Sequence, residues 1–193
     1  MRFSVHVLVS LLLGVAVGRV YGPDFGNLYE IMLYALILLV GIDIGQSFKP
    51  EELGKLGGTA LKLPFATLAG SLLGGLAASL LLGIELRWGL AISAGCGWYS
   101  LTGPLIGRYS PTYGTLGFLA NLIRELLTVL FYPIVIRIIP GELAVSMGGA
   151  TTMDTTLPVM AMFGGRDVAL VAFVHGFVLT AVVPFLIPLF LSL

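Results

Sequence analysis

Three carboxylate side chains interrupt otherwise apolar stretches of the sequence: Asp43, Glu125 and Asp154. An ionisable group inside a membrane costs at least about 2.5–3.5 kcal/mol, and such groups usually have a function. Arg124 is the basic residue that shares this setting. The acids therefore outnumber the bases at membrane depth. This excess of negative charge suits a bound cation, a bound proton or both, and an acid without a basic partner is a candidate proton carrier.

One predicted helix presents several of these groups together. Asn121, Glu125 and Thr128 lie at positions i, i+4 and i+7, so they share one face of a helix. Arg124 lies about 100° around the helix from Glu125, which leaves it free to pair with a different acid. The spacing predicts a polar stripe along this helix.

Two stretches have compositions that disfavour a continuous helix. The first, residues 93–104, contains three glycines, a proline and the hydroxyl side chains of Ser100 and Thr102. Inside a helix each glycine costs about 1 kcal/mol relative to alanine, and a proline costs about 3 kcal/mol. The second stretch, residues 146–158, combines a carboxylate with four threonines: Thr151, Thr152, Thr155 and Thr156. We expect the helix to break in both stretches.

A broken helix at membrane depth implies a cavity. Lipid cannot hydrogen-bond the freed N–H and C=O groups, so non-helical backbone is tolerated there only when it is buried in protein or lines a wet cavity. Paired broken helices build the midplane site of many secondary transporters, where half-helix N-termini face a carboxylate and freed carbonyls face a cation. Alternatively, small residues only let helices pack closely, which is our interpretation of Gly70, Gly74 and Gly75.

Each charged residue also has a structural explanation that the sequence leaves open. Asp43 lies near the end of its apolar stretch and could be a solvated helix end. Arg124 and Glu125 could form a purely structural pair between helices. Asp154 could be the N-cap of the half-helix that leads to Pro158, which would not exclude a binding role.

The remaining candidate residues are His175, Trp98 and Tyr99. His175 is either a proton relay or a hydrogen-bonded packing residue. Trp98 and Tyr99 fit an aromatic belt or the lining of a cavity. The sequence contains no metal-ligand cluster and no spacing of a nucleophile with a base, and a solitary histidine cannot form an enzyme site. We therefore expect neither an enzyme nor a metal or cofactor site.

The composition is that of a membrane protein. Of the 193 residues, 58% are hydrophobic and 10% are charged, against about 45–50% and about 25% in soluble domains. The ten basic residues balance the ten acidic ones, so the net charge indicates no nucleic acid partner. The single cysteine, Cys96, excludes an internal disulfide. The sequence predicts one all-α, polytopic transmembrane domain over residues 1–193, in the lipid bilayer of the cell membrane.

Apolar stretches bounded by glycine, proline and charged residues give seven predicted membrane segments. They are Phe3–Val20, Leu28–Gln46, Gly58–Ile84, Trp88–Gly107, Gly114–Ile139, Leu143–Phe163 and Val168–Leu191. The fourth and sixth segments contain the predicted breaks, so we expect these two to be discontinuous or re-entrant.

The basic residues predict an orientation. With seven crossings, one side holds Arg2, Lys49, Lys55, Lys62, Arg108 and Arg166, and the other holds Arg19, Arg87 and Arg137. The positive-inside rule places the first side, and with it the N-terminus, in the cytoplasm. If one segment is re-entrant, every basic residue that follows it lies on the opposite side of the membrane. The two breaks point the same way in this arrangement. An inverted pair of broken helices therefore requires that one segment is re-entrant, or that a second chain supplies the inverted break.

Four motifs follow one another along the second half of the chain. They are Gly97-Trp98-Tyr99-Ser100-Leu101-Thr102-Gly103, Asn121-Leu122-Ile123-Arg124-Glu125-Leu126, Gly149-Ala150-Thr151-Thr152-Met153-Asp154-Thr155-Thr156-Leu157-Pro158-Val159 and Val174-His175-Gly176-Phe177. In order and spacing they resemble the lysine exporter (LysO) family, and the resemblance covers the chain from about Val40 onward. It implies export of L-lysine and close analogues from the cytoplasm by exchange with protons. It also implies that Glu125 is an essential membrane-embedded acid.

The resemblance leads to a hypothesis for the site. Glu125 and Asp154 would bind an ammonium group, with Asp43, Asn121 and Arg124 as further binding residues. The backbone and hydroxyl groups of the two breaks would bind the α-carboxylate. The sequence does not decide between H⁺ and Na⁺ as the coupling ion.

Two other functions stay open: an exchanger of another organic or inorganic cation for protons, and a non-transporting structural membrane subunit. Longer members of the family carry a further N-terminal segment, so the resemblance implies a short form. We expect a homodimer, or a heterodimer with a small paralogue.

Overall fold

The computed structural model describes residues 2–22, 31, 35, 38–39, 42 and 50–193. In these residues the secondary structure is helical, without a strand. The predicted segment Leu28–Gln46 lies almost wholly outside the described residues, and Asp43 lies outside them too.

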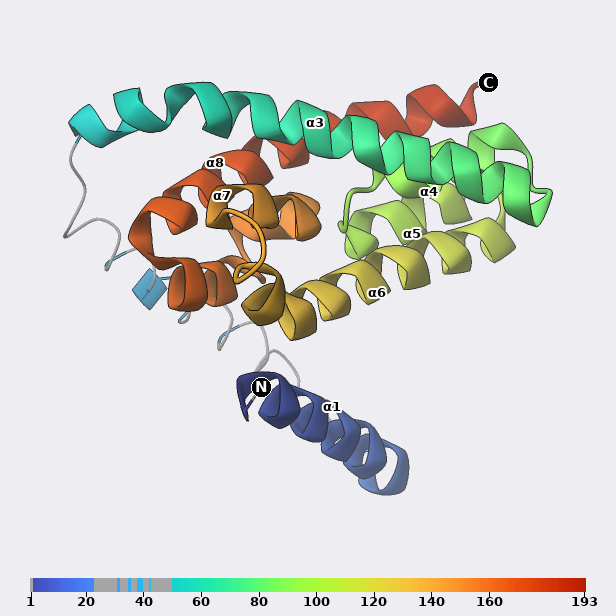
Figure 1. Cartoon of the computed structure of the whole chain (residues 1–193). Coiled ribbons are helices and arrows are strands. Elements are labelled where there is room, and N and C mark those ends of the chain that lie inside the picture. The colour runs from blue at the N-terminus through green and yellow to red at the C-terminus, as the bar shows by residue number, and fades with distance from the viewer. Residues whose placement is uncertain (1, 23–30, 32–34, 36–37, 40–41, 43–49) are drawn as a thin grey trace.

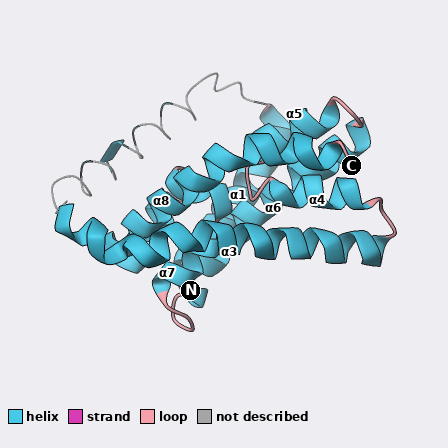
Figure 2. Cartoon of the chain, turned by 90° about the horizontal axis from the view of Figure 1, so that it is seen from above, coloured by secondary structure: helices cyan, strands magenta, loops and turns pink. Residues whose placement is uncertain are grey.

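The helices follow the apolar stretches of the sequence (Figure 1). They are α1 (Arg2–Tyr21), α3 (Pro50–Leu82), α4 (Leu86–Ala94), α5 (Tyr99–Gly107), α6 (Pro111–Val135), α7 (Gly141–Ala144), the 3₁₀ helices η1 (Val145–Met147) and η2 (Gly149–Met153), and α8 (Leu157–Leu191). Figure 2 shows α3 along one edge of the bundle.

Three helices of the described chain are long and apolar enough to cross a membrane: Ala60–Leu82 within α3, α6 and α8. The last of these has a kink at Gly165, whose φ of 78° and ψ of −174° are not helical. Large apolar side chains such as Leu81 and Phe185 are exposed on the outer faces, as expected for helices in contact with lipid. The prediction of an all-α membrane protein is confirmed, whereas the count of seven segments is not.

α4 and α5 form a hairpin that enters the bundle and returns to the same end. At the start of α4, the ring of Trp88 stacks on Tyr113 near the start of α6, with centroids 4.4 Å apart. One turn further, the carbonyl of Ile92 accepts a hydrogen bond from Asn121 of α6. These contacts make α4 parallel to α6. α5 then runs back, and its end packs against the start of α6 at Gly114.

A second hairpin is formed by α7, η1, η2 and the first part of α8. At its root, Gly141 packs against Val168 of α8. At its far end, Thr152 hydrogen-bonds His175, two turns further along α8. The first part of α8 then returns to the kink at Gly165, where Gly164 lies against the hydroxyl of Tyr132 near the end of α6.

The two hairpins enter the bundle from opposite ends. The first follows the end of α3 and the second follows the end of α6, and these ends lie on opposite sides of Figure 1. The fourth and sixth predicted segments, which we expected to be discontinuous or re-entrant, each form a broken hairpin in the described chain. An apolar stretch of about 20 residues is long enough for either arrangement. The two broken hairpins run in opposite directions within this one chain. A second chain is therefore not required to supply the inverted partner of either break.

Cysteine labelling tests this topology. In a Cys96→Ser background, Glu85→Cys and Tyr109→Cys flank the first hairpin, while Ile138→Cys and Asp167→Cys flank the second. We expect an impermeant maleimide to label the first pair from one side of the membrane and the second pair from the other, in cells and in everted vesicles. Seven crossings would instead put the two members of each pair on opposite sides.

Candidate functional site

The two hairpins meet at their breaks in the middle of the bundle. The N–H of Ala150 donates a hydrogen bond of 2.8 Å to the carbonyl of Cys96. Gly97 and Gly149 have φ values of 93° and 64°, which residues with a side chain rarely adopt. A Cβ atom on Gly149 would also clash with the Cys96 carbonyl. The glycines that predicted the breaks are therefore required where the two chain segments touch.

Asn121 of α6 holds the first break in place. Its Oδ1 accepts a hydrogen bond of 2.6 Å from the N–H of Gly97. Its Nδ2 donates to the carbonyl of Ile92 near the end of α4, at 3.0 Å, and to Gly117 within α6. The side chain thus satisfies backbone groups that the break removes from the helical ladder.

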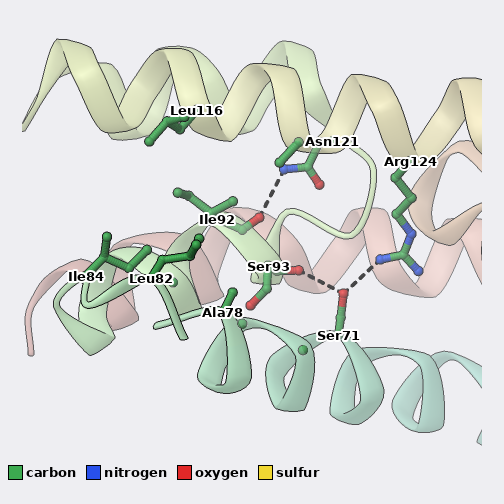
Figure 3. Close-up of a pocket in the computed structure, with 13 residues that line it drawn as sticks. Ser71, Ala78, Leu82, Ile84, Ile92, Ser93, Leu116, Asn121 and Arg124 are labelled. Atoms are coloured by element: carbon green, nitrogen blue, oxygen red, sulfur yellow. Dashed lines mark hydrogen bonds between the residues drawn. The ribbon is translucent and has the colours of Figure 1, made fainter. Parts of the chain in front are cut away.

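Arg124, one turn further along α6, holds the second break. Its Nε donates to the carbonyl of Met147 and its Nη2 to that of Ser146, both at 2.9 Å. Its Nη1 donates to the hydroxyl of Ser71 on α3 at 2.8 Å, and that hydroxyl donates to the carbonyl of Ser93 (Figure 3).

Arg124 does not bond an acid in the described part of the chain. The ion pair found there joins Arg87 to Glu85 at the surface. The structure therefore supports neither the expected pairing of Arg124 with another acid nor the structural pair of Arg124 with Glu125.

Glu125 and Asp154 lie close to each other on the far side of the crossing. Their charges interact, and Glu125 also contacts Thr155. The Oδ1 of Asp154 accepts a hydrogen bond of 2.6 Å from the N–H of Thr155. The Oε2 atom of Glu125 is buried without a hydrogen-bond partner among the described residues. The N-cap of α8 is Thr156, so the capping explanation for Asp154 is wrong.

A small cavity of about 60 Å³ borders Asp154. It is lined by Trp98, Ala150, Thr151, Met153, Asp154 and Thr180. Two waters would fill it, at about 30 Å³ each. The cavity brings together the N-cap of α5, the second break and the later part of α8.

His175 is fully buried and bridges two elements. Its Nε2 lies 2.8 Å from the hydroxyl of Thr67 on α3, and its Nδ1 lies 2.9 Å from the hydroxyl of Thr152 in η2. The Thr152 hydroxyl donates to the carbonyl of Gly149, so the Nδ1 must donate to Thr152. These bonds fit the packing role, and the proton relay stays a prediction.

The other predicted residues of the first break do not line the cavity. The ring of Tyr99 packs edge-on against Phe118, with centroids 5.4 Å apart. Ser100 is exposed. Thr102 is fully buried, and its hydroxyl donates to the carbonyl of Trp98. The hydroxyl of Thr102 therefore supports the hairpin locally.

In the second break the threonines mainly bond to one another and to the local backbone. The hydroxyl of Thr151 donates to the carbonyl of Gly148 and lies 3.2 Å from the hydroxyl of Thr156. The hydroxyl of Thr155 lies 3.4 Å from Asp154. Thr151 is the threonine of this break that also lines the cavity.

The sequence analysis missed three polar residues of the site. Thr67 and Ser71 lie one turn apart within an apolar stretch of α3, and this spacing is a signal that could have identified them. Thr180 is an isolated hydroxyl in the apolar α8, and nothing in its surroundings in the sequence distinguishes it.

The fold and the site define a class of protein. Two opposed broken segments meet inside a bundle of apolar helices, with paired acids beside the meeting point and a buried arginine behind it. This is the architecture of helical secondary transporters.

Comparison with known proteins identifies the family. The family described as "Lysine exporter LysO" matches residues 8–191. The "Lysine exporter LysO" of Escherichia coli K12 is 37% identical over 188 residues, which make up 95% of this chain and 61% of that protein. A "Putative lysine exporter" of Haemophilus influenzae is 31% identical over 196 residues, 97% of each chain. No solved structure matches. The chain belongs to the lysine exporter family, and it spans about 61% of the length of its Escherichia coli relative.

The role of Asn121 can be tested by thermal unfolding in detergent. Asn121→Ala leaves the N–H of Gly97 without its partner and removes one of the two hydrogen bonds to the carbonyl of Ile92, which keeps the one from Gly95. Each such loss costs about 1–3 kcal/mol, so we expect the melting temperature to fall by about 5 °C or more. Thr115→Ala on the exposed face of α6 is the control, because its hydroxyl bonds only the local carbonyl of Pro111. Equal melting temperatures for the two variants would contradict this role.

Proposed function

We propose that this chain exports lysine across the cell membrane and that Glu125 and Asp154 bind the substrate's ammonium group. The observation that carries the proposal is the pair of carboxylates that both hydrogen-bond Thr155 and have no basic partner within 4 Å in the described residues. Two such groups at membrane depth favour a bound cation. The names of the two relatives support lysine as that cation.

The α-carboxylate of lysine would bind at the opposite side of the cavity. Trp98 is the N-cap of α5 and lines this cavity together with Asp154. A helix N-terminus carries about half a positive elementary charge. The free cavity is too small for a whole lysine, so binding requires the two hairpins to separate there.

The hairpins would re-enter the membrane from opposite faces, with α3, α6 and the later part of α8 crossing it. Each hairpin follows a crossing helix, and the two units have opposite directions. Inverted repeats of this kind permit alternating access to a central site. The protein would then expose the acids first to one face and then to the other.

The basic residues support an orientation for this arrangement. Lys55, Lys62, Arg137 and Arg166 belong to the end where α3 begins and α6 ends, and Arg87 and Arg108 belong to the other. By the positive-inside rule the first end is cytoplasmic. The N-terminus lies on the same side if the first two predicted segments both cross.

Replacing the acids tests the binding site. We expect Glu125→Gln and Asp154→Asn each to reduce lysine efflux from proteoliposomes by about tenfold or more, because a hydrogen bond to a charged group is worth about 1.5–3 kcal/mol. Glu85→Gln and Asp167→Asn make the same changes at surface acids and serve as controls. Normal efflux by both site variants would contradict the binding role of the two acids. No efflux by any of the proteins, wild type included, would favour a structural subunit, and efflux of another cation but not of lysine would favour a different exchanger.

The second part of the proposal is exchange with protons. Lysine leaving on one side would be replaced at the acids by a proton from the other, so an acidic exterior should accelerate efflux. The measurement uses vesicles loaded with labelled lysine and a pH-sensitive dye, with the membrane potential clamped. We expect the interior to acidify as lysine leaves, and not in vesicles that contain Glu125→Gln. Efflux that is equally fast without a pH gradient, with no dye response, would exclude the exchange.

A further inference from the structure

The carbonyl ends of both entering half-helices converge on one side chain. In the first hairpin, α4 ends at Ala94, and the carbonyl of Ser93 bonds the hydroxyl of Ser71. In the second, the carbonyls of Ser146 and Met147 in η1 are bonded directly by Arg124. Since the Ser71 hydroxyl also accepts from Arg124 (Figure 3), the guanidinium joins both ends.

Such ends attract a cation. The C-terminus of a helix carries about half a negative elementary charge. In transporters with broken helices, the freed carbonyls and the half-helix C-termini coordinate Na⁺ at the site. In this chain three N–H groups of the Arg124 guanidinium donate hydrogen bonds at these ends: to the carbonyls of Ser146 and Met147 and to the hydroxyl of Ser71.

The backbone around the crossing is shaped to hold the guanidinium. A Cβ atom on Gly149 would lie 3.3 Å from the Cζ of Arg124, and one on Gly97 would lie 3.8 Å from its Cδ. The arginine therefore packs directly over the two glycines of the breaks. Its planar fork of donors matches several fixed carbonyl acceptors in a way that a point charge does not.

We propose that Arg124 is a built-in cation that takes the place of a coordinated Na⁺ at the crossing, so that transport by this chain does not require Na⁺. Arg124 is then a positioning residue for both breaks, separate from the acids that bind substrate. The proposal rests on the proposed function, lysine transport, and it excludes Na⁺ as the obligatory coupling ion.

The test compares the full chain with Arg124→Ala, each purified and reconstituted. Wild-type efflux of lysine should be equal in sodium and in choline media. Arg124→Ala should lose about tenfold or more of the efflux in choline and melt at a lower temperature. Added guanidinium or Na⁺ should raise its melting temperature and its efflux, whereas choline should not. A side chain needed only for packing would show no such cation-specific recovery.

Two further variants make the comparison specific. Arg124→Gln keeps hydrogen-bond donors but removes the charge, and it replaces Arg124→Ala if that variant does not fold. Arg124→Lys keeps the charge and should transport without Na⁺. Arg137→Ala removes an exposed arginine beyond the end of α6, and neither guanidinium nor Na⁺ should change its melting temperature.

The outcomes separate this proposal from the function on which it rests. Lysine efflux that requires Na⁺ in the wild type, or a variant defect that no cation changes, would overturn the built-in cation while leaving lysine transport intact. The opposite result is that neither the wild type nor any variant moves lysine, while guanidinium or Na⁺ raises the melting temperature of Arg124→Ala and Arg124→Gln alone. That result would support the role of Arg124 as a built-in cation and contradict the proposed function.

Discussion

The structure depends on satisfying the backbone groups of two breaks inside an apolar bundle. Each N–H or C=O left unbonded in such surroundings costs several kcal/mol. The breaks partly satisfy each other, through the bond from Ala150 to Cys96. The rest depends on two side chains of α6, since Asn121 bonds the first break and Arg124 the second. α6 is thus the element against which both hairpins are fixed, and the cavity beside Asp154 exists because they are held there.

Helix periodicity separates the charges at this crossing. Arg124 and Glu125 are neighbours in the sequence and therefore point about 100° apart around α6. Arg124 contacts the carbonyl ends of the entering half-helices, where the partial charge is negative. Glu125 faces Asp154, just before the positive N-terminal end of α8. Each charge lies against backbone of the opposite sign, and the acids remain available to a substrate cation while the arginine stays bound to the protein.

The sequence predicted both breaks because glycine, proline and hydroxyl residues disfavour a continuous helix, and it predicted the acids because charge is costly at membrane depth. It predicted that the fourth and sixth segments are discontinuous or re-entrant but did not decide between these two forms, since hydropathy measures length and not direction. It also missed the partners of Arg124, because a carbonyl that becomes free through a break has no signature of its own. Thr180 joins the cavity only through tertiary packing. Glu125 and Asp154, 29 positions apart in the sequence, were assigned to one ammonium site, and that role stays a prediction.

The closed cavity limits how such a protein could work. In the proposed function, admitting a lysine beside Asp154 would require the hairpins to separate, which would break the bond from Ala150 to Cys96 or strain those of Arg124. A neutral hydrogen bond contributes about 0.5–1.5 kcal/mol and one to a charged group about 1.5–3 kcal/mol, so opening costs several kcal/mol. A ligand shifts such an equilibrium only by its difference in affinity for the two states. In the proposed function the two carboxylates would supply that difference, because the small cavity cannot accommodate the ammonium-bearing chain that a wider one would bind.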